Sequence, residues 1–430
     1  MNKEYVIRLI QTFNPQWTDK KTDTPEFKRE IHEKINKYLN KKQIIALTGI
    51  RRVGKTTVMK QLIAEMPQKK CIYFSFDETD LQTKDVLNFV INYFINNFDA
   101  KYLFFDEIHY IPDWQGILKR HYDTTDLKFI ISGSASLHIR KGRESLAGRI
   151  MYFHLPPLEF REFLALNKEE LELKGMLRQI YEQTLPRKEF FEKMFNEYIY
   201  KGGFPEIACE NDEEYIRTYI KEMVVRKIIL EDIPKIMEIK RKNALYDLFK
   251  FACKESSNIF EINNLANMLG MNAETVSNYL LYLKLSYLIK ISETYSKSIA
   301  TRIKKNKKIY TTHPCIAFAV LNYGKNILDV EQLAGQYVET LFAEKFFWRS
   351  KEKYEVDAVI EGQDDELLPV EIKYRNQISK KNLKGLLKFC DRFKCKKGIV
   401  VTKDWFGEEN IDGRKIQYIP AWLYLLKNKK

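Results

Sequence analysis

The sequence predicts an α/β protein with several domains, in which a parallel sheet comes first and a second α/β domain comes last. Its 430 residues exceed the length at which a single core usually stops growing. Short apolar runs alternate with helical stretches in the N-terminal third of the chain, as in sheets whose strands are parallel. Hydrophobic residues form 45% of the chain, which is ample for packed cores and excludes a mainly disordered protein.

We expect five segments along the chain. Residues 1–40 are a polar, helical lead-in, and residues 41–160 contain the parallel sheet. Residues 161–235 are charged and helical, as expected of a lid or connector. A winged helix-turn-helix is expected at 236–312, and the last α/β domain at 313–430. The lead-in has one apolar stripe at helical spacing, formed by Ile31, Ile35 and Leu39.

Four apolar runs in the 41–160 segment are the expected strands. They are short and almost free of polar residues, as in strands buried on both faces of a parallel sheet. The runs are Ile44 to Leu47, Cys71 to Phe76, Tyr102 to Phe105 and Phe129 to Ile131.

A phosphate-binding motif follows the first of these strands. The segment GIRRVGKT fits the P-loop pattern GxxxxGK[ST], and it opens a helical stretch, as a P-loop must. Gly49 and Gly54 let backbone N–H groups approach phosphate oxygens at a helix N-terminus. Lys55 is expected to reach the β and γ phosphates of ATP, and Thr56 to ligate Mg²⁺. Thr57 completes the expected nucleotide-binding set.

The strand that begins at Tyr102 ends in two carboxylates, which is the Walker B form. We expect Asp106 to hold Mg²⁺ through water and Glu107 to orient and polarise the attacking water, because hydrolysis needs one carboxylate for each task. The run Cys71 to Phe76 lies between the two motifs along the chain. We therefore expect a sheet with an additional strand between the Walker A and Walker B strands, and Mg²⁺-dependent ATP hydrolysis.

Two later residues are candidates for contacts with the γ-phosphate. Ser134 follows the strand that ends near Ile131, where its hydroxyl could bond the γ-phosphate or the attacking water. A serine at the end of a strand is, however, more often a turn former. Arg149 could point at the γ-phosphate of a neighbouring subunit, although an isolated arginine more often lies on a solvated surface.

Several motifs together resemble the prokaryotic AAA-type ATPases whose C-terminal half is recorded as a domain of unknown function. They are GIRRVGKTT, FFDEIHYIPDW, ISGSAS and ESLAGRI followed by LPPLEFREFL, and the likeness continues into YKGGFP and the C-terminal segment. The resemblance implies an AAA fold, and it makes Arg149 a candidate arginine finger and the protein a candidate homo-oligomer. His109 lies in the matching run, where a histidine is more often structural than a proton shuttle.

A helix-turn-helix is predicted by two stretches whose apolar residues repeat with helical spacing on either side of Gly270. A recognition helix would present polar side chains to base edges, and a following wing would present cations to phosphates. A winged helix attached to an ATPase can also serve only for packing or protein contacts, so both roles stay open. The polar candidates are Asn272, Thr275, Ser277 and Asn278, and the wing cations are Arg302, Lys304, Lys305, Lys307 and Lys308.

Four charged residues in the last segment have an informative order. Glu339 is expected on a helix, Asp357 on a strand, and Glu371 and Lys373 on one face of the next strand. The arrangement is similar to the PD-(D/E)xK nuclease fold, whose order is αβββαβ, although no proline precedes Asp357. In that fold Glu339, Asp357 and Glu371 would bind Mg²⁺, and Lys373 would stabilise the attacking hydroxide or the developing phosphorane charge. A binding module without cleavage is the alternative.

Charge and cysteine usage bear on partners and location. The formal net charge of +14 favours polyanions such as DNA. The six cysteines include no CxxC pair, which makes a structural zinc site improbable and agrees with a cytoplasmic protein with reduced thiols. We expect no membrane segment. Our leading hypothesis is therefore a cytoplasmic AAA-type ATPase that acts on or near DNA, and the alternative is a nucleotide-switched protein that contacts other proteins only.

Overall fold

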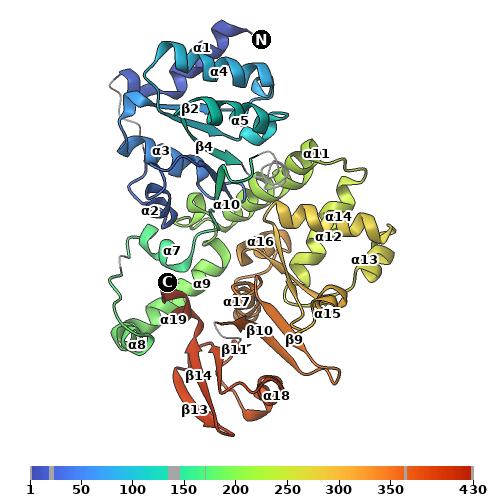
Figure 1. Ribbon diagram of the computed structural model, residues 1–430. Helices are drawn as coiled ribbons and strands as arrows, with labels where there is room; N and C mark the ends of the chain where they lie inside the picture. Colours follow the sequence, from blue (N-terminus) through green and yellow to red (C-terminus); the bar gives the residue numbers. More distant parts are fainter. Residues whose placement is uncertain (1, 19–23, 134–145, 170, 363–365, 428–430) are drawn as a thin grey trace. The chain divides into compact units, whose positions relative to one another are not determined.

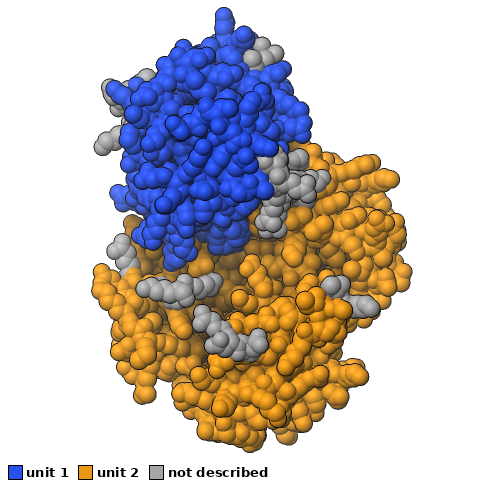
Figure 2. All heavy atoms as spheres, viewed as in Figure 1, with its two compact units in different colours: residues 1–157 blue, residues 158–430 orange. Residues whose placement is uncertain are grey.

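The chain divides into two compact units, Met1–Pro157 and Leu158–Lys430 (Figure 2). The first unit contains the predicted lead-in and parallel sheet, and the second contains the other three predicted segments. The computed structural model describes residues 2–18, 24–133, 146–169, 171–362 and 366–427.

The first unit is built on a five-stranded parallel sheet in the order β2-β3-β4-β1-β5. Figure 1 shows its strands β2 and β4 together with the helices α1, α4 and α5. The Walker A strand β1 and the Walker B strand β3 are not neighbours, because β4 pairs with both. The predicted additional strand between them is confirmed, but it is β4, whereas β2 lies at the edge of the sheet. The strands are β1 (Ile44–Thr48), β2 (Cys71–Ser75), β3 (Tyr102–Asp106), β4 (Lys128–Gly133) and β5 (Ile150–His154).

Helices cover this sheet with apolar side chains. The core beside α1, α4 and α5 includes Phe74, Phe105 and Trp114, none of which is accessible to solvent. The predicted stripe of the lead-in is confirmed, because its three residues are buried. The helices are α1 (Lys3–Phe13), η1 (Pro15–Thr18), α2 (Ile31–Asn36), α3 (Lys55–Glu65), η2 (Gln68–Lys70), η3 (Thr79–Leu81), α4 (Lys84–Asn97), η4 (Ile108–Tyr110) and α5 (Trp114–Thr124).

The second unit begins with helices, as predicted for residues 161–235. Gly203 follows α9, where an added Cβ would lie 2.9 Å from the ring of His313, so the close approach requires glycine. No helix within the described residues combines the length and the hydropathy that a bilayer crossing needs. The helices are α7 (Phe160–Leu166), α8 (Leu177–Thr184), η5 (Leu185–Arg187), α9 (Lys188–Lys201), η6 (Pro205–Ile207), α10 (Glu213–Thr218), η7 (Tyr219–Arg226), η8 (Ile228–Asp232) and α11 (Ile233–Ile236).

A module of helices and a small sheet follows. The predicted helix pair is confirmed: Gly270 ends the first helix in a left-handed conformation, and Asn272 caps the second by accepting a hydrogen bond from the backbone N–H of Thr275. The predicted pair of strands also forms, within a three-stranded sheet of order β6-β8-β7. The elements are α12 (Lys242–Lys254), β6 (Ile259–Phe260), α13 (Ile262–Leu269), α14 (Ala273–Leu285), β7 (Ile289–Glu293), α15 (Ile299–Lys304) and β8 (Lys307–Thr311).

One prediction about this module is wrong. Lys307 and Lys308 lie in strand β8 and not in a loop, and Lys308 is buried, with 2% of its surface exposed. Arg302 and Lys304 also lie outside a loop, in helix α15, so only Lys305 of the five predicted wing cations lies between the elements. Lys308, being buried, is lost as a phosphate contact. The physical reason is strand alternation, which turns neighbouring side chains to opposite faces of the sheet.

The remaining residues form the last α/β part of the second unit. Its six-stranded sheet has the order β13-β14-β12-β11-β10-β9. Along the chain one helix, three strands, another helix and a fourth strand follow each other, so the predicted αβββαβ order is confirmed. The elements are α16 (Pro314–Val320), α17 (Ile327–Thr340), β9 (Phe346–Arg349), β10 (Glu355–Glu361), β11 (Leu367–Lys373), η10 (Lys380–Leu383), α18 (Lys384–Phe393), β12 (Lys397–Thr402), β13 (Gly407–Ile411), β14 (Arg414–Pro420) and α19 (Ala421–Leu426).

A histidine lies in the core where α9, α16 and α17 meet. The ring of His313 packs against Tyr198 and Tyr337, and its Nδ1 accepts a hydrogen bond of 3.3 Å from the backbone N–H of Cys315 at the start of α16. Burial, helped by the charge of Lys290, lowers the pKa of His313 from 6.5 to about 3. The fold therefore keeps this ring uncharged.

His313→Asn should flatten the acid dependence of stability, because Asn can cap α16 but does not titrate. The folded pKa of about 3 lies below the ordinary 6.5, so the stability due to the neutral ring is complete above about pH 6.5 and is lost as the pH falls toward 3. At pH 5 this loss is roughly 2 kcal/mol, since each pH unit is worth about 1.4 kcal/mol.

Urea unfolding of parent and variant at pH 7.5 and pH 5 measures the effect. The difference between their unfolding free energies should shrink by about that amount at the lower pH. A difference that stays constant would show that burial of the neutral ring does not set the acid response.

Candidate functional site

The P-loop joins strand β1 to helix α3 and is shaped by its glycines. A Cβ on Gly49 would lie 2.3 Å from the carbonyl oxygen of Leu155, and Gly54 caps α3 in a left-handed conformation. Lys55 is buried, and its Nζ donates to the carbonyl oxygens of Gly49 at 3.1 Å and Ile50 at 3.2 Å. The ammonium group thus lies inside the curve of the loop, where phosphate oxygens would meet it.

The lead-in supports this loop, a role that the sequence did not reveal. Arg29 is buried, and its guanidinium donates to the carbonyl oxygens of Val53 and Pro156, each at 2.8 Å. Gln61 on α3 donates to the carbonyl oxygens of Pro25 and Phe27. No local sequence signal marks Arg29, because its acceptors are backbone atoms far along the chain.

Asp106 receives hydrogen bonds from three hydroxyl groups. Thr56 donates at 2.5 Å, Tyr73 donates at 2.8 Å, and Ser132 donates to the other carboxylate oxygen. Thr56 and Asp106, both predicted to take part in Mg²⁺ binding, therefore lie side by side. Tyr73 on β2 and Ser132 on β4 were missed, and Ser132 is buried beside Asp106 because β4 lies next to β3.

The residues at this point fit a magnesium ion. The Thr56 hydroxyl and the Asp106 carboxylate face each other, and Mg²⁺ in nucleotide sites is held by such oxygens together with phosphate oxygens and water. Thr57 lies one residue further in the first turn of α3. When bound, the ion would supply charge neutralisation at the phosphates.

Glu107 lies in the turn after β3 and is held in a left-handed conformation, with φ of 53°. Its backbone N–H donates to the Ser132 hydroxyl at 3.1 Å. Burial alone would raise the pKa of Glu107, but Lys55, His109 and Arg51 outweigh burial and hold that pKa well below its usual range. Glu107 is therefore a carboxylate, which a group that accepts a proton from water must be.

His109 is the direct neighbour of this carboxylate. Its ring has no accessible surface, and its Nδ1 lies 3.1 Å from Oε2 of Glu107. The ring also packs against Tyr110, with the two ring planes tilted by 36°. These contacts agree with a structural role for His109.

The two candidates for γ-phosphate contacts have different outcomes. Ser134 lies outside the described residues. Arg149 forms two hydrogen bonds with the carboxylate of Asp123, of 2.9 and 3.1 Å, at a partly exposed position. The role of Arg149 in another subunit stays a prediction.

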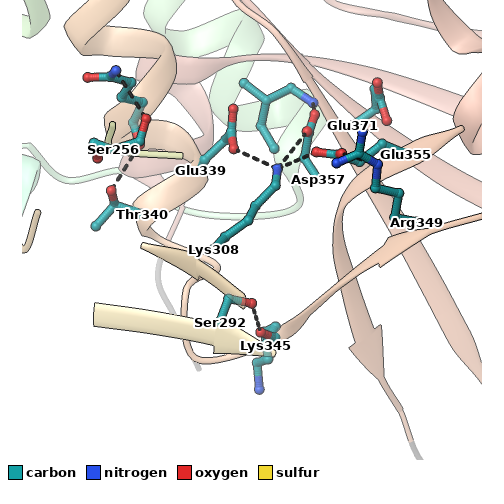
Figure 3. A network of polar contacts seen from close by, with 12 residues as sticks. Ser256, Ser292, Lys308, Glu339, Thr340, Lys345, Arg349, Glu355, Asp357 and Glu371 are labelled. Carbon is teal, nitrogen blue, oxygen red and sulfur yellow. Dashed lines mark hydrogen bonds and ion pairs between the residues drawn. The ribbon is translucent and has the colours of Figure 1, made fainter. Parts of the chain in front are cut away.

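A second group of charged residues lies in the second unit, around the Lys308 side chain (Figure 3). The Nζ of Lys308 is 2.6 Å from Glu355, 3.4 Å from Glu339 and 3.6 Å from Asp357. Burial would lower the pKa of Lys308, but the surrounding carboxylates outweigh burial and raise it well above its usual value. Lys308 is thus a buried cation with carboxylate partners on three sides.

The predicted residues of the last segment do come together here. Asp357 accepts a hydrogen bond of 2.8 Å from the backbone N–H of Ile372, and Glu371 accepts one from Lys373 on the same face of β11. Burial, and then the charge of Asp357, raises the pKa of both Glu339 and Glu371, and the ammonium groups of Lys308 and Lys373, respectively, oppose this rise.

This arrangement does not fit a divalent metal ion. Within the described part of the chain, no group of three or more His, Cys, Asp or Glu side chains could hold one. The carboxylates of Glu339, Glu355 and Asp357 are turned toward the Lys308 ammonium instead. Sequence reasoning missed Lys308 and Glu355 as members of this group.

Three family models match the chain. Residues 41–164 match a model described as an AAA domain. Residues 192–326 and 329–424 match two models described as domains of unknown function, DUF8612 and DUF4143.

The chain is also similar to two proteins of Methanocaldococcus jannaschii, the uncharacterized proteins MJ1544 and MJ1637. MJ1544 is 27% identical over 422 residues, which cover 92% of this chain and 91% of that protein. MJ1637 is 28% identical over 429 residues, which cover 92% of this chain and 88% of that protein.

Among solved structures, AMPPCP-bound DnaA from Aquifex aeolicus matches with 15% identity and a TM-score of 0.27, over 63% of this chain and 92% of that chain. A TM-score at this level does not establish a shared fold. The AAA model spans the P-loop and both Walker B carboxylates. The chain therefore carries an AAA-type P-loop domain.

Proposed function

We propose that this protein binds ATP with Mg²⁺ and hydrolyses it. The observation that carries the proposal is the meeting of the P-loop residue Thr56 with Asp106, next to the charged carboxylate of Glu107. Lys55 would hold the β and γ phosphates, and Glu107 would orient the attacking water and accept its proton. The AAA domain match supports the same activity.

Two substitutions separate nucleotide binding from hydrolysis. Lys55→Ala removes the cation that holds the phosphates and should abolish productive ATP binding. Glu107→Gln keeps the shape of the side chain but removes the group that accepts the proton, so ATP should still bind while turnover falls by roughly 10²–10⁴-fold. Calorimetry with ATP and a phosphate-release assay measure the two effects. Equal turnover in Glu107→Gln and the parent would refute the role of Glu107.

Arg149 is proposed to act as an arginine finger on the nucleotide of a second copy of the chain. Arg149→Ala should then keep ATP affinity and lose up to about 10³-fold in turnover. Mixing it with Glu107→Gln protein should restore part of the activity, because some interfaces would combine an intact Arg149 with an intact Glu107.

Asp123→Ala is the matched control for Arg149. It removes the partner of the guanidinium within the chain but leaves Arg149 itself in place. Turnover should therefore not fall with this variant. Absence of rescue in oligomers shown to be mixed would count against the finger.

The module of residues 236–312 is proposed to be a winged helix that contacts DNA. Its order of helices and its small sheet support this proposal, and so does a pocket of about 500 Å³ beside the turn of the helix pair. The pocket lining includes Lys240, Arg241 and Lys242, whose charges would attract phosphates. The alternative, a nucleotide-switched module that contacts only other proteins, predicts no DNA affinity of this kind.

DNA binding should weaken steeply with salt, because phosphate contacts release counterions. Fluorescence anisotropy with labelled duplex DNA at several salt concentrations gives the slope of log K against log salt. Lys240→Gln should make that slope shallower by about 0.9, the value for one lost phosphate contact. Lys254→Gln is the control, because Lys254 lies at the other end of α12, roughly 18 Å from its start. A shallow slope for the parent would favour the protein-only alternative.

The last α/β part is proposed to have the PD-(D/E)xK nuclease-like fold. The αβββαβ order supports this, as do the positions of Glu339, Asp357, Glu371 and Lys373 on the expected elements. Because Lys308 lies among these carboxylates, we assign no cleavage step to them and propose a binding role for this part.

A further inference from the structure

The carboxylates of Glu339, Glu355 and Asp357, called the carboxylate group below, surround a cation that comes from a neighbouring module. Lys308 belongs to β8, which pairs with β6 and β7, whereas Glu339 is on α17 and Glu355 and Asp357 are on β10. Only 3% of the Lys308 side chain is exposed. Its ammonium nitrogen lies 5.4 Å from the centre of the Phe347 ring. The ammonium group ends between the carboxylates (Figure 3).

We propose that Lys308 is a built-in cation that takes the place of a divalent metal ion and keeps this carboxylate group closed to metal. The inference rests on the proposed nuclease-like fold in one respect, because that fold is the reason to expect a metal ion at these carboxylates. The contacts themselves involve only residues described above.

An ammonium group and a divalent ion cannot share this position. Mg²⁺ requires carboxylate oxygens at about 2.0–2.1 Å, whereas the same oxygens of Glu355, Glu339 and Asp357 lie at 2.6–3.6 Å around Nζ of Lys308. A metal at their centre would overlap the ammonium group, and two cations so close would repel each other strongly in a buried place.

The environment would favour a metal if Lys308 were absent. Glu371 is 5% exposed, and its Oε2 has no hydrogen-bond partner among the described residues. Without Lys308 the remaining cations would be Arg349, 3.8 Å from Glu355, and Lys373, 3.9 Å from Asp357, whereas Glu339 would lose its cation. Buried carboxylates that lose their partner are costly, and a divalent ion would offset this cost.

Lys308 is held in place by its strand. Thr340 on α17 donates to the carbonyl oxygen of Thr311 at the end of β8, and Ser292 on β7 donates to the carbonyl oxygen of Lys345. These bonds join the small sheet to the helix and the loop that border the carboxylates (Figure 3). Metal binding between these carboxylates would therefore require the Lys308 side chain to leave its position.

Binding of Mn²⁺ to the full chain without nucleotide tests the inference, because it needs no assumption about cleavage. The number of ions bound per chain can be counted by electron paramagnetic resonance, which reports free Mn²⁺. Lys308→Met keeps the length of the side chain and removes its charge, so it should bind one more Mn²⁺ than the parent. This gain should disappear in the double variant Lys308→Met, Asp357→Asn.

Lys307→Met is the matched control. It changes the neighbouring lysine of the same strand, which lies 3.7 Å from Glu293 and outside the carboxylate group. It should bind as many ions as the parent does. A gain of binding in this control equal to that of Lys308→Met would overturn the inference.

The parent protein provides a second test that holds even if Lys308→Met does not fold. Its Mn²⁺ binding should be the same in the parent, Asp357→Asn and Glu339→Gln, because the group is closed. A parent site that depends on Asp357 or Glu339 would overturn the inference, as would a folded Lys308→Met with no added ion. If the parent did not hydrolyse ATP or bind DNA, the proposed functions would be contradicted, but the number of Mn²⁺ ions bound would still test this inference.

Discussion

A buried charged group needs polar or charged partners within hydrogen-bonding distance, and this constraint shapes both candidate sites. In the first unit the Asp106 carboxylate is buried, and hydroxyl groups of three separate elements donate to it. In the second unit the Lys308 ammonium is buried, and carboxylates of α17 and β10 surround it. Leaving either charge without partners would cost several kcal/mol. The elements that bring the partners must therefore stay together for each unit to remain folded.

The same constraint makes the two sites differ in their ability to bind a metal ion. Around Asp106 the partners are neutral hydroxyls, and burial together with the charge of Glu107 raises the pKa of this carboxyl group. An incoming cation would stabilise its charged form, and Thr56 offers a further oxygen. Around Lys308 the cation is already part of the chain. One group of oxygens can thus receive magnesium with a nucleotide, whereas the other is saturated by the protein itself. Acidic residues at similar spacing along a sequence do not by themselves distinguish these two cases.

The sequence predicts the parts that depend on local patterns. The apolar runs give the strands of the first sheet, and the GxxxxGK[ST] spacing and the two carboxylates after β3 give the nucleotide site. The order of Glu339, Asp357 and Glu371 along the chain also predicts the helix α17 and the strands β10 and β11 that carry these residues. Contacts between distant residues were not predictable: Tyr73 and Ser132 reach Asp106 only through the order of the strands, which places β4 between β1 and β3.

Lys308 shows most clearly why contacts between distant residues were not predicted from the sequence. In the sequence it is one of several lysines in a basic stretch, and its neighbour Lys307 has the same chemistry. The strand β8 turns Lys307 toward Glu293 and Lys308 toward the carboxylates, so a single step along the strand decides between a surface cation and a buried one. A shift of one residue in the pairing of β8 with β7 would exchange the two lysines between these faces. The register of this small sheet therefore decides whether the carboxylate group is filled by the chain, which no residue count along the sequence reveals.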